Sequence, residues 1–129
     1  MDTIVLQGMQ FYGYHGCFAE EQEGGQPFRV DLTMYVDLTK AGESDDLTDT
    51  VNYSAVYEDV RRIVETGADP VSDTKPYNLI EKVAAVIAHT VLTDFPAVSA
   101  VSVTVHKPHA PIRGLFDDVA VTIERKRHG

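Results

Sequence analysis

The sequence lacks the features of a secreted or membrane-spanning protein. Its single cysteine, Cys17, excludes an internal disulfide and favours a reducing compartment. No apolar run approaches the ~20 residues that a membrane-spanning helix needs. Residues 1–3, Met-Asp-Thr, have neither the basic nor the apolar region of a secretory signal. We therefore predict a soluble, cytoplasmic protein.

Basic residues are also scarce relative to acidic ones. The chain has 11 lysines and arginines against 20 aspartates and glutamates, which gives a formal net charge of −9. Surfaces that bind nucleic acid are basic, so this balance disfavours a nucleic-acid partner. The one basic cluster, Arg125-Lys126-Arg127-His128, is expected to be a solvated tail.

The remaining features predict one globular domain over residues 1–129. A chain of 129 residues, of which 43% are apolar, can bury a core of its own. Alternating apolar and polar residues predict strands over residues 3–12, 28–38, 101–107 and 116–125. Apolar residues at helical spacing predict helices over residues 54–66 and 79–93.

Polar residues between these elements predict caps and loops. Asn52 or Ser54 is expected to cap the first helix, and Asn78 the second. The acidic segment 40–50 is expected to be a solvated loop. Residues 67–76 contain two prolines and are expected to form a loop as well.

The order of two strands, two helices and two strands predicts an α+β domain. We expect one four-stranded antiparallel sheet with both helices on one face. The other face, whose residues are mixed polar, would meet water or a ring of subunits. Four strands also leave two exposed edges, so we expect oligomers that pair through those edges.

The strand over residues 101–107 ends in an informative side chain. Its three valines alternate with polar residues, and Lys107 shares the parity of the valines. Pro108 should end the strand because it cannot donate to a sheet. An ammonium at the end of an apolar face is partly desolvated, which favours proton exchange near neutral pH. The alternative is a strand-end lysine that extends into water.

Two glutamates and a tyrosine are further candidates. Glu21 lies beside a glycine-rich turn, where backbone can approach a ligand, or is one of several solvated glutamates. Glu81 has the spacing of a capping box with Asn78, a role that would explain it fully. A carboxylate at a helix start could also accept two hydrogen bonds from the amidine-like edge of a heterocycle. Tyr53 opens the first helix and belongs either to the core or to a pocket wall.

Four residues are available as metal ligands: His15, Cys17, His106 and His109. None of them falls in a zinc-binding pattern, and Pro108 interrupts the pair His106-x-x-His109. A serine–histidine–aspartate triad and a phosphate-binding glycine loop have no supporting motif either. We expect no catalytic metal.

Several segments, in their order and spacing, carry a resemblance to a known family. They are Phe11-Tyr12-Gly13-Tyr14-His15-Gly16, Glu21 with Gly25-Gln26 and Phe28-Arg29-Val30-Asp31, Ser44-Asp45-Asp46-Leu47, Asp49-Thr50-Val51-Asn52-Tyr53, Asn78-Leu79-Ile80-Glu81-Lys82-Val83-Ala84, Val105-His106-Lys107-Pro108 and Asp117-Asp118-Val119-Ala120. With these segments the chain resembles dihydroneopterin aldolase of folate biosynthesis over nearly its whole length.

The resemblance implies the tunnelling fold, in which subunits join their sheets into a ring-shaped barrel. Such rings usually contain four subunits, and two rings stack. The resemblance also implies active sites at subunit boundaries and a reaction without a metal or organic cofactor. In the implied reaction, 7,8-dihydroneopterin splits into 6-hydroxymethyl-7,8-dihydropterin and glycolaldehyde, and epimerisation at C2′ is a second activity. The implied partners are pterins and further copies of the chain.

Roles for individual residues also follow from the resemblance. Glu81 would anchor the amino and N3 edge of the pterin, Lys107 would transfer protons, and Glu21 would be the second acid of the catalytic site. Tyr53 would be supplied by the neighbouring subunit. Backbone groups near the pterin would come from Val51, Asn52 and Ile80.

One segment departs from the resemblance, because the stretch of residues 67–76 is longer than is usual in the family.

Three alternative functions stay open. A dihydroneopterin triphosphate epimerase of the same fold should need positive groups, which the acidic loops argue against. The others are a non-catalytic oligomeric pterin-binding or scaffold protein and a zinc enzyme of the same wider fold. No Schiff base on Lys107 is expected, because the C6=N5 imine of the substrate can accept the electrons.

Overall fold

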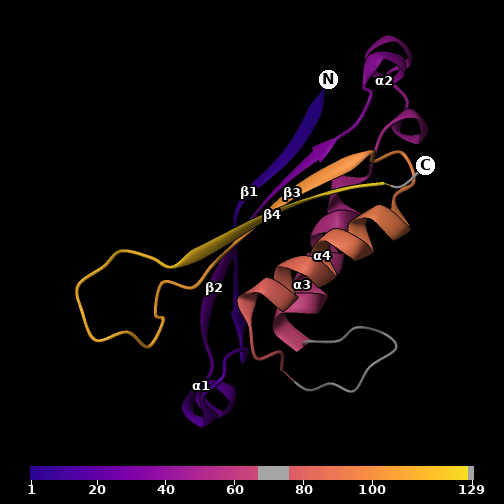
Figure 1. The fold of residues 1–129 in the computed structure, drawn as a ribbon. Helices are drawn as coiled ribbons and strands as arrows, with labels where there is room; N and C mark the ends of the chain where they lie inside the picture. Colours follow the sequence, from indigo (N-terminus) through magenta and orange to yellow (C-terminus); the bar gives the residue numbers. More distant parts are fainter. Residues whose placement is uncertain (67–75, 128–129) are drawn as a thin grey trace.

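The computed structural model describes residues 1–66 and 76–127. In these ranges the larger helices lie on one side of a sheet (Figure 1). The strands are β1 (Thr3–Gly13), β2 (Gln26–Tyr35), β3 (Ala100–His106) and β4 (Ala120–Lys126). The helices are α1 (Ala19–Gly24), α2 (Thr39–Ser44), the short 3-10 helix η1 (Leu47–Asp49), α3 (Tyr53–Thr66) and α4 (Ile80–Asp94).

The strands form one antiparallel sheet in the order β1-β2-β3-β4, so β1 and β4 are its edges. The register of β1 against β2 shifts between Leu6 and Met9. This β-bulge contains Gly8, whose φ of +71° is one that glycine adopts without strain. The Gly8 amide donates to the Asp31 side chain at 2.7 Å, which anchors the bulge to β2.

Helices α3 and α4 cover one face of the sheet and form the core with it (Figure 1). Alternate residues of β2 and β3 point into this core, while the residues between them are half-buried and mostly polar. The fold predicted from the sequence is therefore confirmed. Deeply buried residues are Phe28, Val30, Leu32 and Met34 of β2, Val101, Val103 and Val105 of β3, Val56, Val60, Ile63 and Val64 of α3, and Val83, Ala84, Ile87, Ala88 and Val91 of α4.

Some strand boundaries differ from the predictions. β2 ends at Tyr35 rather than at residue 38, and β4 begins at Ala120 rather than at residue 116. β3 ends at His106, which leaves Lys107 just outside the strand. The β1–β2 ladder ends at the pair Thr3–Tyr35 and the β3–β4 ladder at the pair His106–Ala120, although single backbone bonds continue from Val36 to Asp2 and from Lys107 to Val119.

The acidic segment 40–50 is not the loop that its composition suggested. It contains α2 and η1, which side-chain bonds stabilise locally. Asp46 accepts from the Thr48 amide at 2.9 Å, and Lys40 lies 3.2 Å from Asp49. The segment nevertheless stays at the surface, as its charge requires.

One of the predicted helix caps is present and the other is not. Asn52 accepts from the Ser54 amide at 3.1 Å and so caps α3. α4 begins one residue later than predicted, with Leu79 at its cap position and no side-chain cap bond. The Asn78 carboxamide instead accepts from the Gln22 side chain at 3.1 Å. The predicted capping box of Asn78 and Glu81 is therefore wrong, because the Asn78 side chain binds Gln22 instead of the first turn of α4.

The basic cluster near the end of the sequence is not wholly a solvated tail. The Arg127 guanidinium donates to the carbonyl oxygens of Leu92 and Phe95 at the C-terminal end of α4 and to that of Val98 in the segment that follows. It thereby satisfies acceptors that the end of a helix leaves without partners. His128 and residues 67–75 of the expected loop lie outside the described residues. No helix within the described ranges has the length and apolarity to cross a membrane.

Candidate active site

An ion pair between Lys107 and Glu21 is the centre of the candidate site. Lys107 follows β3 and Glu21 lies in α1, and the lysine Nζ is 2.5 Å from the glutamate Oε2. The side chains are only 12% and 9% exposed. A lysine extending into water and a solvated glutamate were the alternatives, and both are wrong.

Glu21 is held by groups other than Lys107 as well. Its Oε2 also accepts from the Gln26 side chain at 2.9 Å, and its Oε1 accepts from the Phe18 amide at 3.3 Å. Burial would raise the pKa of Glu21, but the bonds from Lys107, Gln26 and Phe18 outweigh it and hold that pKa below its usual value. Glu21 is thus an oriented carboxylate at neutral pH.

Gly16 explains how the turn before α1 fits against this carboxylate. A Cβ atom at residue 16 would lie 2.4 Å from the carboxyl carbon of Glu21, so a larger residue would displace Glu21. The Gly16 amide donates to the Tyr77 carbonyl at 2.9 Å. The turn therefore supports both the ion pair and the segment that leads into α4.

His15 links the same two parts of the chain. Its side chain is almost fully buried, and its Nδ1 accepts from the Tyr77 amide at 3.0 Å. The proton is therefore on Nε2, which donates to the Val64 carbonyl at 2.8 Å. Burial lowers the pKa of His15, which agrees with a neutral ring in this position. We interpret His15 as a structural residue.

The start of α4 is thereby placed beside α1. Gln22 donates to the Gly16 carbonyl at 2.7 Å as well as to Asn78, and the Cys17 thiol donates to the Asn78 carbonyl at 3.3 Å. Ile80 and Glu81 follow directly in the first turn of the helix. Ile80 is buried, whereas Glu81 is exposed and leaves its carboxylate open to a ligand.

Tyr53, Val51 and Asn52 lie at the other end of the sheet. α1 precedes β2 and α2 follows it, and Figure 1 shows the two helices at opposite ends of the molecule. A strand of ten residues spans roughly 30 Å, so one chain does not bring Tyr53 to Lys107. The Tyr53 side chain is 59% exposed, so the core interpretation is wrong, and it lines a cavity of about 570 Å³ beside α2 and η1.

Gln26 is a site residue that the sequence reasoning missed. It is 7% exposed and orients Glu21, while its own carbonyl oxygen has no partner among the described residues. A signal was available, since Gln26 shares the parity of Phe28 and Val30 on the buried face of β2. A polar residue at a core position usually has a specific partner.

The structure does not bring the four possible metal ligands together. His15 is engaged by backbone groups, and His106 lies between Asp31 and Asp118 on the other face of the sheet. His109 is exposed in the segment between β3 and β4. In residues 1–66 and 76–127, no group of three histidine, cysteine or acidic side chains is arranged to hold a metal ion.

Comparisons with known proteins show which family the chain is similar to. Residues 4–124 match the family model described as FolB, dihydroneopterin aldolase. The dihydroneopterin aldolases of Bacillus subtilis and Streptococcus pyogenes serotype M3 are 46% and 45% identical to the chain over 127 residues. These alignments cover 98% of this chain and 99% and 100% of the relatives. The structure of Escherichia coli dihydroneopterin aldolase in complex with neopterin superimposes with a TM-score of 0.83 at 31% identity, over 97% of this chain and 99% of that one.

Proposed function

This chain belongs to the dihydroneopterin aldolase family and has the lyase activity of that family, and we propose which of its residues perform the reaction. The observation that carries the proposal is the buried ion pair of Lys107 and Glu21 beside the open first turn of α4. Lys107 and Glu21 transfer protons, Glu81 binds the substrate ring, and Tyr53 comes from a neighbouring subunit.

The cleavage of 7,8-dihydroneopterin needs two proton transfers. The 2′-hydroxyl gives up its proton, the C1′–C2′ bond breaks, and its electron pair moves into the C6=N5 imine of the ring. Glycolaldehyde leaves, and a proton is then added at C1′ to give 6-hydroxymethyl-7,8-dihydropterin. In the Lys107–Glu21 ion pair, the Glu21 carboxylate takes up the first proton and the Lys107 ammonium delivers the second, through a bound water. The proton on Glu21 then passes to the Lys107 amine, which restores the pair.

Glu81 is proposed to fix the pterin ring. The amino group and N3–H of a pterin form a flat edge with two donors, and a carboxylate accepts both. Glu81 is exposed in the first turn of α4, and the backbone of Ile80 is next to it. The neopterin bound by the Escherichia coli relative supports a pterin as the ligand class.

The second half of the site is proposed to come from another copy of the chain. Val51, Asn52 and Tyr53 lie too far from Lys107 in one subunit, and both edges of the sheet are open to a neighbour. Pairing of β1 with β4 of the next subunit would close a ring of four and join the two halves of each site. Two such rings would form an octamer.

Epimerisation at C2′ is proposed as a second activity of the same site. If glycolaldehyde rotates in the site and presents its other face before it leaves, reversal of the bond cleavage forms the C1′–C2′ bond again with the opposite configuration at C2′. The step uses the same protons and the same residues, and it needs no cofactor. Incubation of 7,8-dihydroneopterin with the enzyme should produce the C2′ epimer alongside the cleavage products, and its complete absence would contradict this activity.

Hybrid oligomers test the shared site. Lys107→Ala should reduce kcat by about 10²–10⁴-fold with a smaller effect on binding, and Tyr53→Ala should also impair turnover. After dissociation and reassembly of a 1:1 mixture of the Lys107→Ala and Tyr53→Ala chains, about a quarter of the sites would contain both wild-type halves. Activity should then return toward that level, and the same treatment of Lys107→Ala mixed with a Lys107→Ala/Tyr53→Ala chain is the control. No recovery in the first mixture would contradict a site shared between subunits.

A further inference from the structure

A cluster of charged side chains lies on the sheet face opposite the Lys107–Glu21 pair. His106 is the last residue of β3, and its side chain is 13% exposed. Its Nε2 lies 2.7 Å from Asp31 Oδ2, and its Nδ1 lies 2.5 Å from Asp118 Oδ2. Asp31 also accepts from the Gly8 amide in the β1 bulge. The cluster therefore connects β1, β2, the end of β3 and the residues directly before β4.

His106 can donate to both carboxylates only when its ring carries two protons, because a neutral imidazole has one N–H. Arg29 Nη2 is 3.2 Å from the same Nδ1, but the shorter contact to Asp118 identifies Nδ1 as a donor. Arg29 is therefore a charged neighbour of the cluster. Burial opposes ionisation of Asp31, yet the bonds from Gly8 and His106 and the charges of His106 and Arg29 hold the pKa of Asp31 below its usual value.

The cluster meets the backbone of Lys107 at the base of the segment 107–119. This segment leaves the sheet after β3 and returns at β4 (Figure 1). The Lys107 amide donates to the Val119 carbonyl at 2.7 Å. The residues directly before these two, His106 and Asp118, are joined by their side chains. Lys107 is thus bound to Glu21 on one face of the sheet, and the adjacent His106 is bound to Asp118 on the other. Together these contacts fix the direction in which the Lys107 side chain leaves the backbone.

We propose that the Asp31–His106–Asp118 cluster is a positioning device that holds the Lys107 amine against the Glu21 carboxylate. This inference rests on the proposed roles of Lys107 and Glu21. His106 and Asp118 point away from the ion pair, so they are positioning residues and act through the backbone. Seven residue pairs hold β3 to β4, and His106–Ala120 is the last of them, so loss of the Asp118 bond loosens the end of the ladder and leaves the rest intact.

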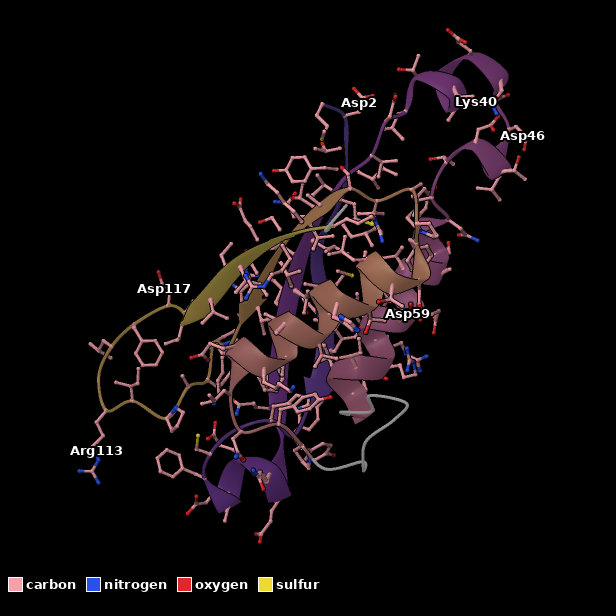
Figure 2. The ribbon with its side chains drawn as sticks, turned by 45° about the vertical axis from the view of Figure 1, so that its right-hand side comes forward. Asp2, Lys40, Asp46, Asp59, Arg113 and Asp117 are labelled. Carbon is pink, nitrogen blue, oxygen red and sulfur yellow. The ribbon has the colours of Figure 1, made fainter. Side chains whose placement is uncertain are left out.

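The test compares Asp118→Ala with Asp117→Ala. Asp117 is the adjacent residue, is exposed, and points outward from the segment (Figure 2), so its substitution changes the charge equally. Asp118→Ala should lower kcat for 7,8-dihydroneopterin by about 10–10²-fold, the cost of a small misplacement of a reacting group, with KM changed by less than about threefold. Asp118→Asn keeps an oxygen that can accept from His106 and should recover part of the loss. Asp117→Ala should retain the wild-type kcat and KM.

A second measurement reports on Lys107 directly. Acylation of Lys107 by acetic anhydride, followed by mass spectrometry, should be faster in Asp118→Ala because the amine is less firmly paired. A wild-type kcat in a folded Asp118→Ala variant, or a lower kcat with unchanged acylation of Lys107, would overturn the proposal. If Asp118→Ala does not fold, the same two measurements on Asp118→Asn decide.

Lys107→Ala measured alongside separates the two levels of inference. Wild-type turnover in Lys107→Ala would remove the proposed catalytic role itself. Loss of turnover in Lys107→Ala together with a wild-type kcat in Asp118→Ala would remove only the positioning role.

Discussion

The two ends of the sheet present their site residues in different ways. At the end with α1, Lys107 and Glu21 are mostly buried, are bonded to each other, and are supported by Gln26 and the turn at Gly16. At the end with α2, Tyr53 is mostly exposed and borders an open cavity. Figure 2 shows Lys40 of α2 and Asp46, which caps η1, far from the α1 end. The difference is consistent with the proposal that proton transfer is organised within one chain and that a second chain completes the site.

The largest expected effect separates binding from chemistry at the α1 end. Glu81→Ala should weaken the binding of 7,8-dihydroneopterin by about 10²-fold or more, since two hydrogen bonds to a charged group are lost. Isothermal titration with a pterin measures this. Glu23→Ala, an exposed glutamate in α1, is the control and should bind as the wild type does. Near-normal affinity in Glu81→Ala would refute its role as the ring anchor.

The next effect compares glycines at the two ends. Gly16→Ala should displace Glu21 from its partners, lower kcat by about 10–10²-fold and lower the unfolding free energy by about 1–3 kcal/mol. A Cβ at Gly42 in α2 meets no atom within 4 Å, so Gly42→Ala should stabilise the protein by about 0.4–1 kcal/mol. Denaturant unfolding and steady-state kinetics provide the measurements. Equal stability changes in the two variants would show that the α1 end is no more tightly packed than the α2 end.

The smallest effect lies between the two ends, where α3 and α4 bring Asp59 near Asp94. Burial, followed by the hydrogen bond and negative charge of Asp94, raises the pKa of Asp59 despite the nearby Arg62. A raised carboxyl pKa favours the folded state at low pH, and this contribution is lost as the pH rises through the raised value. Asp94→Asn should therefore raise Tm at pH 7 by on the order of 1 °C.

The pH profile of Tm is the measurement for Asp94→Asn. The gain should vanish below the usual carboxyl range, where Asp59 is protonated in both states. Glu43→Gln removes one exposed charge in α2 and serves as the control. A gain that persists unchanged in acid would point to a cause other than the Asp59–Asp94 pair.

Much of the fold could be predicted because burial repeats along each element. Alternation in β2 and β3 and the apolar spacing of α3 and α4 report directly which face meets the core. The same parity correctly placed Lys107 on the covered side of the sheet. The cap at Asn52 was also predictable, because it involves residues only two apart.

The parts that could not be predicted depend on contacts between distant segments. The N-x-x-E spacing at Asn78 suggested a capping box, but Gln22 binds Asn78 and no local pattern reports this. The partners of Glu21 and His106 come from other elements, so their pairing follows only from the assembled sheet. The separation of Tyr53 from Lys107 likewise became visible only once both ends of β2 were located.

A chain whose two functional halves face in opposite directions would belong to two catalytic centres at once. In the proposed ring, one chain with both halves damaged would silence two sites while its neighbours remained intact. A defective copy would then reduce the activity of the assembly by more than its share of the subunits. Dilution would act in a similar way, because a subunit released from the ring would retain its ion pair and still lack a complete centre.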